Sequence, residues 1–395
     1  MTDLKPFAGK AKAMMAAASQ ATGGLTDFGD PDTFIPGLNR LLQSLNNEDL
    51  HFTPQGHTYV TQIIVGNLIA RLLTEQGWKD HPQCLQQPIR RPLIILGIPR
   101  TGTTALHKLL SVDPQFQGLE RWLTTFPMPR PPRAEWESNP WHQACVAGLE
   151  AFLDSVPELR AAHDLQADDV DECLDVLKQN FCSNFFGSSV DIPAYDEWWL
   201  QQSEAPAYQR YYKVLQLIAA NSPNKTWLLK NPGHVANVDL LLDIFPDACV
   251  VQTHRDPVKA MPSLCSVLSF GRSMIEGERA RLNKIGGREL AYWGKAVIDA
   301  DKARQQAPDQ FLDVIHADFH SDPMAVVKNI YNYFDFELTP EVTKAMTDRI
   351  ARNPEGSHGQ HHYTLEKFGL TEQQIADRFR DYRAKYLNSK AEKLL

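Results

Sequence analysis

The 395 residues are enough for one large domain or two or three ordinary ones, and the 43% hydrophobic content allows a sizeable core and excludes global disorder. The net charge of −8 argues against general nucleic-acid binding, which needs a basic surface. We expect no membrane span, because no apolar run approaches the roughly 20 residues that cross a bilayer. The six cysteines match neither a Cys-x-x-Cys pair nor a zinc pattern with histidine, so we expect reduced thiols in a cytoplasmic protein.

The N-terminal part of the sequence predicts helices, and we expect residues 1–80 to form a separate helical segment. Within residues 58–76, apolar side chains recur at helical spacing: Val60, Ile63, Ile64, Leu68 and Leu72. The short apolar run at 93–96 then predicts a first buried strand. A helix is expected to follow it, from about Gly102 to Leu110.

Strands and helices alternate in the rest of the chain. Residues 141–220 predict a mostly helical insertion. Further strands are expected at 227–229, 249–253 and 312–315, and further helices at 235–244 and 323–333. This alternation predicts an α/β fold with a central, mostly parallel sheet and helices on both faces. No linker composition separates these pieces, so residues 81–395 are expected to form one domain.

The segment from Gly97 to Thr104 has the features of a phosphate-binding loop. It lies between a predicted strand and a predicted helix, where unsatisfied backbone N–H groups and the helix dipole favour an anion. Its glycine spacing matches a Walker A loop, but Thr103 occupies the position of the Lys that holds the β and γ phosphates of a nucleoside triphosphate. Arg100 supplies a cation inside the loop instead, and its guanidinium suits phosphate or sulfate oxygens.

The run Pro99-Arg100-Thr101-Gly102-Thr103-Thr104 resembles the loop of sulfotransferases that use 3′-phosphoadenosine 5′-phosphosulfate (PAPS), and its continuation at 106–114 is similar to the bacterial branch. The resemblance implies a P-loop-like fold and a loop that binds the 5′-phosphosulfate. In that family, an Arg after a later strand and a Ser eight positions on contact the 3′-phosphate. Arg255 and Ser263 match this second motif. The resemblance extends from about Arg91 to Leu370.

Sulfuryl transfer needs a base for the acceptor proton and cations for the leaving phosphate. We expect Arg100 and Lys230 to supply the charge, because relatives commonly carry a Lys at the end of the second strand. Glu120 is the first candidate for the base, since some relatives use a Glu after the first helix and burial would raise its pKa. His234 is the second candidate, although it lies four positions after Lys230 rather than two, and His163 is the third.

The stretch from Asn353 to Tyr363 is unusually rich in histidine, with three within five residues: His358, His361 and His362. Composition alone favours metal binding. The resemblance implies instead a loop of the Gly-His-Tyr type that closes over the nucleotide, with His358 and Tyr363 as donor contacts. We therefore expect no metal.

The resemblance implies an enzyme that transfers a sulfuryl group from PAPS to a hydroxyl and leaves adenosine 3′,5′-bisphosphate. The acceptor stays open between a carbohydrate, a lipid and a small molecule, and the sequence does not predict the oligomeric state. An aromatic-rich stretch between Phe181 and Tyr212 predicts either an acceptor pocket or the core of a helical cap. Two alternatives are a P-loop nucleotide kinase or triphosphatase and a non-catalytic nucleotide-binding scaffold.

Overall fold

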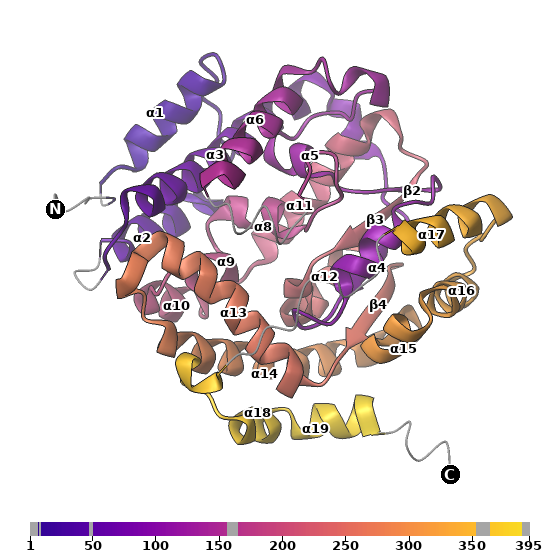
Figure 1. The fold of residues 1–395 in the computed structure, drawn as a ribbon. Coiled ribbons are helices and arrows are strands. Elements are labelled where there is room, and N and C mark those ends of the chain that lie inside the picture. Colours follow the sequence, from indigo (N-terminus) through magenta and orange to yellow (C-terminus); the bar gives the residue numbers. More distant parts are fainter. Residues whose placement is uncertain (1–6, 8, 47–49, 156–164, 353–363, 389–395) are drawn as a thin grey trace, which may run out of the picture. The chain divides into compact units, whose positions relative to one another are not determined.

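The computed structural model describes residues 7, 9–46, 50–155, 165–352 and 364–388 (Figure 1). The chain divides into two compact units, each assembled from segments that are far apart in sequence. The first unit comprises Met1–Ile89, Leu119–Lys225 and Arg272–Ala280, and the second comprises Arg90–Gly118, Thr226–Gly271 and Arg281–Leu395. In this division, the N-terminal helices share a unit with the helices of residues 141–220.

Among the described residues, the second unit contains a five-stranded sheet in the order β2-β3-β1-β4-β5, with every neighbouring pair parallel. The strands are β1 Leu93–Leu96, β2 Phe116–Gln117, β3 Thr226–Lys230, β4 Cys249–His254 and β5 Phe311–Ile315. The four strands predicted from apolar runs are confirmed, with ends that agree within one residue. β2 was not predicted, because two residues are too few to show a periodic pattern.

The register of the central strands places the starts of three chain segments together, at the carboxyl ends of the strands. Ile95 in β1 lies opposite Lys230 in β3 and Val251 in β4. The carboxyl ends of these parallel strands therefore lie together, which is where open α/β sheets bind ligands. The loop that starts at Gly97, the side chain of Lys230 and the turn that carries Arg255 all follow from these strand ends.

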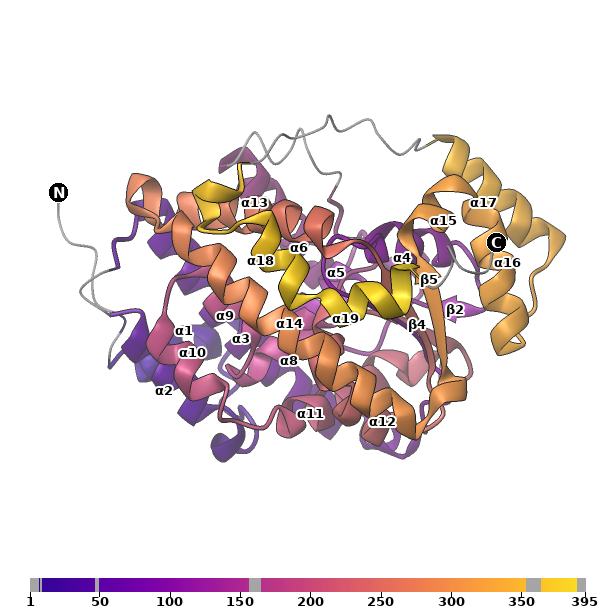
Figure 2. The same cartoon turned by 90° about the horizontal axis from the view of Figure 1, so that it is seen from below.

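Helices cover both faces of the sheet, as the alternation of elements predicted. The helices of this unit are α4 Thr103–Leu110, α12 Val238–Ile244, α14 Ile285–Ala303, α15 His316–Ser321, α16 Pro323–Phe334, α17 Pro340–Arg352, α18 Glu372–Arg378 and α19 Arg380–Arg383. Helix α13, Pro257–Glu276, belongs to this unit as far as Gly271, and its last residues belong to the first unit. On one face, α4, α15, α16 and α17 bury a core that includes Ile95, Leu106, Val251 and Phe334. On the other face, α12 and α14 pack together (Figure 2).

The described part of the first unit is built from helices, and the helices predicted at 58–76 and 141–220 are confirmed. Its helices are α1 Ala11–Ala21, α2 Ile35–Ser44, α3 Pro54–Asp80, α5 Arg121–Thr125, α6 Pro140–Ser155, α8 Leu174–Leu177, α9 Asn184–Ser189, α10 Pro193–Trp199 and α11 Ala205–Ile218. The 27-residue helix α3 packs against α1 and α11. It begins at Pro54 because the Thr53 hydroxyl accepts the Gly56 N–H at 2.8 Å. Within the described residues, no helix has the length and apolar character needed to cross a bilayer.

Candidate functional site

The phosphate loop joins β1 to α4 through backbone conformations that favour glycine. Gly97 has φ of +152° and Gly102 has φ of +91°. A Cβ at Gly97 would lie 2.4 Å from the Thr253 hydroxyl, so only glycine fits between the loop and β4. Arg100 also has a positive φ, +71°, which is strained for a residue with a side chain. Gly102 provides no side-chain cap for α4, so the first amides of this eight-residue helix are suited to an anion.

A pair of buried hydroxyls fixes the loop to the neighbouring strand. Thr101 donates a hydrogen bond from Oγ1 to the Ile98 carbonyl at 2.8 Å, and the same oxygen lies 2.6 Å from Oγ1 of Thr253. Thr253 also reaches the Leu96 carbonyl at 3.3 Å. The side chain of Thr101 is only 1% exposed. It therefore holds the loop from within, whereas the neighbouring Thr104 is exposed.

Three residues from two distant segments meet at the exposed side of this loop. Arg100 donates from Nε to the Ser263 hydroxyl at 3.1 Å, and Arg255 donates from Nη1 to the backbone carbonyl of Arg100 at 2.9 Å. Arg255 leaves the carboxyl end of β4, and Ser263 projects from the second turn of α13. The structure therefore brings together the two motifs that the sequence identified more than 150 residues apart.

Lys230 adds a third cation at the carboxyl ends of the strands. Its side chain is 3% exposed, and Nζ donates to the Thr104 hydroxyl at 3.3 Å. Behind it lies His107, which is fully buried. Burial lowers the pKa of His107 to about 3, and the charge of Lys230 acts in the same direction. His107 is therefore neutral at pH 7 and adds no positive charge next to Lys230.

Glu120 lies in the first unit, immediately before α5, in a buried ion pair. Its Oε2 accepts hydrogen bonds from Nη2 and Nε of Arg130 at 2.9 and 3.2 Å, and the two side chains are 12% and 11% exposed. Burial raises the pKa of Glu120 and outweighs the opposing effect of Arg130, while Asp168 raises it further. A partly desolvated carboxylate of this kind is a stronger base than one in water.

His234 is placed very differently from Glu120. It lies in the 3₁₀ turn Pro232–Asn237 after β3 and is 0% exposed. Burial lowers the pKa of His234 to about 3, so its imidazole is neutral. Three other predicted residues lie outside the part of the chain that the structure describes: His163, His358 and Tyr363.

The structure also adds residues that the sequence did not identify. His316, the first residue after β5, lies against the phosphate loop: its Cδ2 is 3.2 Å from the position that a Cβ of Gly102 would occupy. Its place after the carboxyl end of a parallel strand was the available signal. Arg130 gave no such signal, because it lies in a proline-rich loop and meets Glu120 only through the fold.

Comparisons with known proteins agree with this geometry. A family model described as "Sulfotransferase family" matches residues 92–340. The omega-hydroxy-beta-dihydromenaquinone-9 sulfotransferase Stf3 of Mycobacterium bovis is 24% identical over 270 residues, which cover 65% of this chain and 67% of Stf3. The crystal structure of sulfotransferase STF1 from Mycobacterium tuberculosis H37Rv has a TM-score of 0.83 and 33% identity, over 95% of this chain and 100% of that one. STF9 from Mycobacterium avium has a TM-score of 0.87 and 27% identity, over 98% of both chains.

These matches confirm the resemblance first carried by the phosphate loop, and they support sulfuryl transfer rather than the kinase or triphosphatase alternative. The chain belongs to the sulfotransferase family and is an enzyme that transfers a sulfuryl group to a hydroxyl.

Proposed function

We propose that this sulfotransferase takes its sulfuryl group from PAPS and transfers it to a hydroxyl of a lipid-like acceptor. The observation that carries the donor assignment is the convergence of Arg100, Ser263 and Arg255 at the phosphate loop. A donor that is phosphorylated at both its 3′ and 5′ positions needs two anion sites next to each other. The second unit supplies two such groups of residues at the carboxyl ends of its strands: the phosphate loop with Arg100, and Arg255 with Ser263.

The residues present are suited to this donor. The first amides of α4, together with Arg100 and Thr104, would hold the 5′-phosphosulfate, as backbone amides and guanidinium groups hold oxyanions elsewhere. Pro99, Thr101, Gly102 and Thr103 complete the loop around it. Arg255 and Ser263 would hold the 3′-phosphate. Gly97 and Gly102 permit the close backbone approach that such a ligand requires.

We assign the proton transfer to Glu120. The acceptor oxygen forms a bond to sulfur as the bond between sulfur and the 5′-phosphate oxygen breaks. The acceptor proton passes to the Glu120 carboxylate, and Arg100 and Lys230 stabilise the charge that develops on the leaving phosphate. We prefer Glu120 to His234 as the base, because the Glu120 side chain keeps 12% exposure whereas His234 is 0% exposed. The proposed role for Lys230 rests on its hydrogen bond to Thr104 at the start of α4.

The proposed acceptor class rests on two observations. The relative Stf3 is named for a menaquinone acceptor. Within the first unit lies a small apolar cavity of about 20 Å³, which has room for about one water molecule. Its walls include Leu41, Tyr59, Ile63, Phe185, Phe186 and Ile275. A lining of this kind suits a hydrocarbon chain better than a sugar. In the aromatic stretch, Tyr208 and Tyr211 belong instead to the core.

Ligand-induced stabilisation tests the donor, because a ligand that binds only the folded protein raises its melting temperature. We expect adenosine 3′,5′-bisphosphate without added metal to raise the melting temperature more than magnesium-ATP does. Stabilisation by magnesium-ATP alone would contradict the donor assignment. The bisphosphate would also be expected to inhibit transfer from labelled PAPS in competition with the donor.

A separate assay tests the acceptor. Labelled PAPS is offered with long-chain alcohols, isoprenoid alcohols, small phenols and sugars, and we expect the alcohols with apolar chains to be sulfated fastest. Ile63→Trp, which narrows the pocket, should raise KM for long chains more than for short ones. The matched control is Leu200→Trp, at a side chain that is 64% exposed. Sugars as the best substrates would rule out the lipid-like class.

We also propose that the enzyme works in the cytoplasm and without a nucleic-acid partner. All six cysteines lie among the described residues and are thiols rather than disulfides, as a reducing compartment permits. The net charge of −8 disfavours a polyanionic partner. Cell fractionation with an antibody against the chain tests the location, and recovery in a secreted fraction would contradict it.

A further inference from the structure

The C-terminal segment of the second unit packs against the strand that leads to Arg255. Helices α18 and α19 lie along α14 and end in a π-helical turn, Ala384–Asn388 (Figure 2). All of these residues lie beyond residue 340, where the family match ends. Two tyrosines of this segment reach His254, the last residue of β4. The Tyr386 ring stacks on the His254 ring with centroids 4.0 Å apart, and Tyr382 forms a hydrogen bond to it.

A directed chain of hydrogen bonds passes through His254. Asp313 in β5 accepts two bonds from Arg304, at 2.8 and 3.1 Å, and lies 2.8 Å from Nε2 of His254. Burial opposes the charge on Asp313, but the hydrogen bonds from His254 and Arg304 outweigh it and hold the pKa of Asp313 at about 2. The carboxylate therefore accepts, and Nε2 of His254 donates.

The direction of the next bonds follows from the state of His254. Burial lowers the pKa of His254 and keeps its ring neutral, so Nδ1 is an acceptor. The hydroxyl of Tyr382, 3.0 Å away, therefore donates to Nδ1. The Tyr382 hydroxyl therefore holds the His254 ring at Nδ1, while Asp313 holds it at Nε2. The chain of bonds thus fixes the residue that immediately precedes Arg255.

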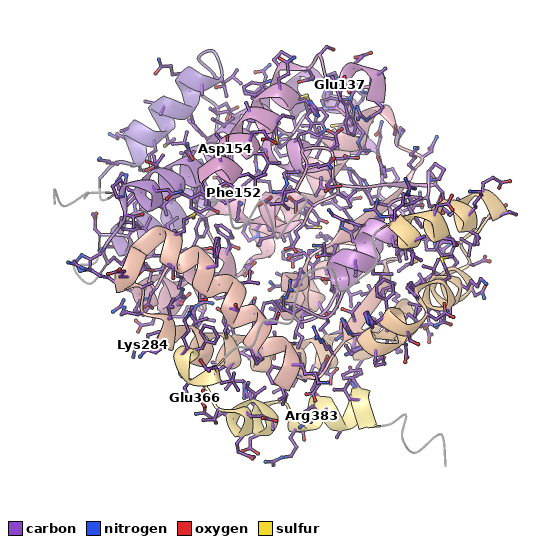
Figure 3. The ribbon with its side chains drawn as sticks, viewed as in Figure 1. Glu137, Phe152, Asp154, Lys284, Glu366 and Arg383 are labelled. Carbon is purple, nitrogen blue, oxygen red and sulfur yellow. The ribbon has the colours of Figure 1, made fainter. Side chains whose placement is uncertain are left out.

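A second contact holds the residue on the other side of Arg255. Arg383 of α19, labelled in Figure 3, lies 3.2 Å from both carboxylate oxygens of Asp256, through Nε and Nη2. Asp256 is the residue before α13, and its Oδ1 accepts the Val258 N–H at 3.1 Å. The same segment therefore contacts His254 and Asp256, the two neighbours of Arg255. Asp256 also caps α13, the helix that carries Ser263.

We propose that residues 382–388 act as a clasp that positions Arg255, and that Tyr382 and Arg383 are positioning residues for the 3′-phosphate of the donor. The inference rests on the proposed function, in which Arg255 contacts that phosphate. In this proposal, Tyr382 and Arg383 do not contact the donor themselves. Each acts on the main chain around Arg255, so the guanidinium of Arg255 leaves a fixed backbone and reaches the Arg100 carbonyl at 2.9 Å.

The experiment compares binding of two probes, adenosine 3′,5′-bisphosphate and adenosine 5′-monophosphate, to the full-length enzyme. The ratio of the dissociation constant of the monophosphate to that of the bisphosphate measures recognition of the 3′-phosphate and cancels effects on the rest of the site. We expect Arg255→Ala to reduce this ratio by about 100-fold or more, as loss of a charged contact does. Tyr382→Phe and Arg383→Gln should each reduce it by about 5-fold, the size of one lost hydrogen bond. KM for PAPS should rise while kcat at saturating donor stays within about 2-fold.

Two matched controls accompany these variants. Arg380→Gln removes an exposed arginine from the same helix, where it pairs with Asp377. Tyr333→Phe removes a tyrosine hydroxyl that bonds only weakly, at 3.3 Å, to the carbonyls of Asp309 and Phe311. Neither control should change the ratio. Melting curves identify any variant that fails to fold. If Tyr382→Phe does not fold, Arg383→Gln, at a partly exposed site, is sufficient to test the inference.

The outcomes separate the inference from the assignment on which it rests. An unchanged ratio in Arg255→Ala would refute the 3′-phosphate assignment itself. A reduced ratio in Arg255→Ala with unchanged ratios in Tyr382→Phe and Arg383→Gln would refute the clasp alone. In the Arg255→Ala background, Tyr382→Phe should have no further effect on the ratio. A full additive effect there would show that Tyr382 does not act through Arg255 and would overturn the inference.

Discussion

Arg255 donates a hydrogen bond of 2.9 Å from its guanidinium to the main-chain carbonyl of Arg100. The acceptor residue has a φ of +71°, so the bond supports a backbone conformation that is unfavourable for arginine. Arg100 in turn donates to Ser263. The residues proposed for the two ends of the donor are therefore coupled before any ligand contact is considered. A change at one arginine should alter the position of the other.

Thr101 provides a first test of how the loop is held. Thr101→Val keeps the shape of the side chain but removes its bonds to Ile98 and Thr253, and leaves the buried Thr253 hydroxyl poorly satisfied. We expect the free energy of unfolding to fall by about 1–2 kcal/mol and the affinity for adenosine 3′,5′-bisphosphate to fall with it. Denaturant unfolding and calorimetry measure the two effects. The control Thr347→Val, at an exposed helical position, should cost much less; an equal loss would show that the Thr101–Thr253 contact is not special.

Glu120 provides a test of the proposed base. Glu120→Gln should reduce kcat by about 100-fold or more, because the amide cannot take a proton, and should leave donor binding unchanged. The control is Glu137→Gln, an exposed glutamate of the same unit that is labelled in Figure 3. Measurement of kcat and of bisphosphate affinity separates the two steps. Full activity in Glu120→Gln would remove this residue from the mechanism.

The pH dependence of kcat tests the ion pair of the same residue. The carboxyl must be ionised to act as a base, so kcat should rise with pH through an elevated pKa of Glu120, which burial raises and Arg130 opposes. Arg130→Gln removes the opposing charge. The acidic limb of the kcat profile should therefore move to higher pH, whereas Arg352→Gln, at an exposed site on α17, should not move it. A shift to lower pH in Arg130→Gln would contradict the assignment.

These tests concern residues that the sequence predicted unequally well. The run at 93–96 predicted β1 because four apolar residues lie between Pro92 and Gly97, and the phosphate loop followed because its chemistry is local. The pairing of Glu120 with Arg130 and the contact between His254 and Tyr382 were not predictable. The second of these joins residues 128 positions apart, and local patterns carry no information about such pairs. The two-unit organisation depends on such distant pairs too, since nothing local marks which helices share a core.

The stability of the protein in acid should depend on His107 and His234, two of the buried histidines of the second unit. The pKa of His107 and the pKa of His234 are both lowered to about 3 by burial, whereas the unfolded chain binds these protons near pH 6.5. Below pH 6.5 the unfolded state therefore holds more protons than the folded state, and stability falls as the pH drops toward 3. Each histidine should contribute a slope of about 1.4 kcal/mol per pH unit.

His107→Gln removes one of the two groups that take up a proton on unfolding. Between pH 5 and pH 4, the slope of stability against pH should therefore fall by about 1.4 kcal/mol per pH unit, the contribution of one proton. Urea unfolding at a series of pH values gives the slope directly, and the slope is informative even if the variant is less stable overall. His320→Gln, at an exposed position, is the control and should leave the slope unchanged. The same slope in His107→Gln as in the original chain would show that His107 can be protonated in the folded state.

Arg100 combines backbone strain with a proposed catalytic charge, and two substitutions separate them. Arg100→Gly removes the side chain and relieves the strain at φ +71°, so the free energy of unfolding should change by less than about 1 kcal/mol. Arg100→Ala keeps the strain and should be less stable than Arg100→Gly by about 1 kcal/mol. Both variants lose the guanidinium, so both should bind adenosine 3′,5′-bisphosphate about 100-fold more weakly or worse.

Asp335→Gly is the matched control for the backbone effect. Asp335 ends α16 with a φ of +55°, so glycine should relieve strain there without any effect on the donor. Unfolding curves and donor titrations on the three variants give all the comparisons. If Arg100→Gly kept the donor affinity of the original chain, the loop amides and Arg255 would be sufficient for binding. Arg100 would then serve the loop through its backbone alone, and Lys230 would have to supply the charge for the leaving phosphate.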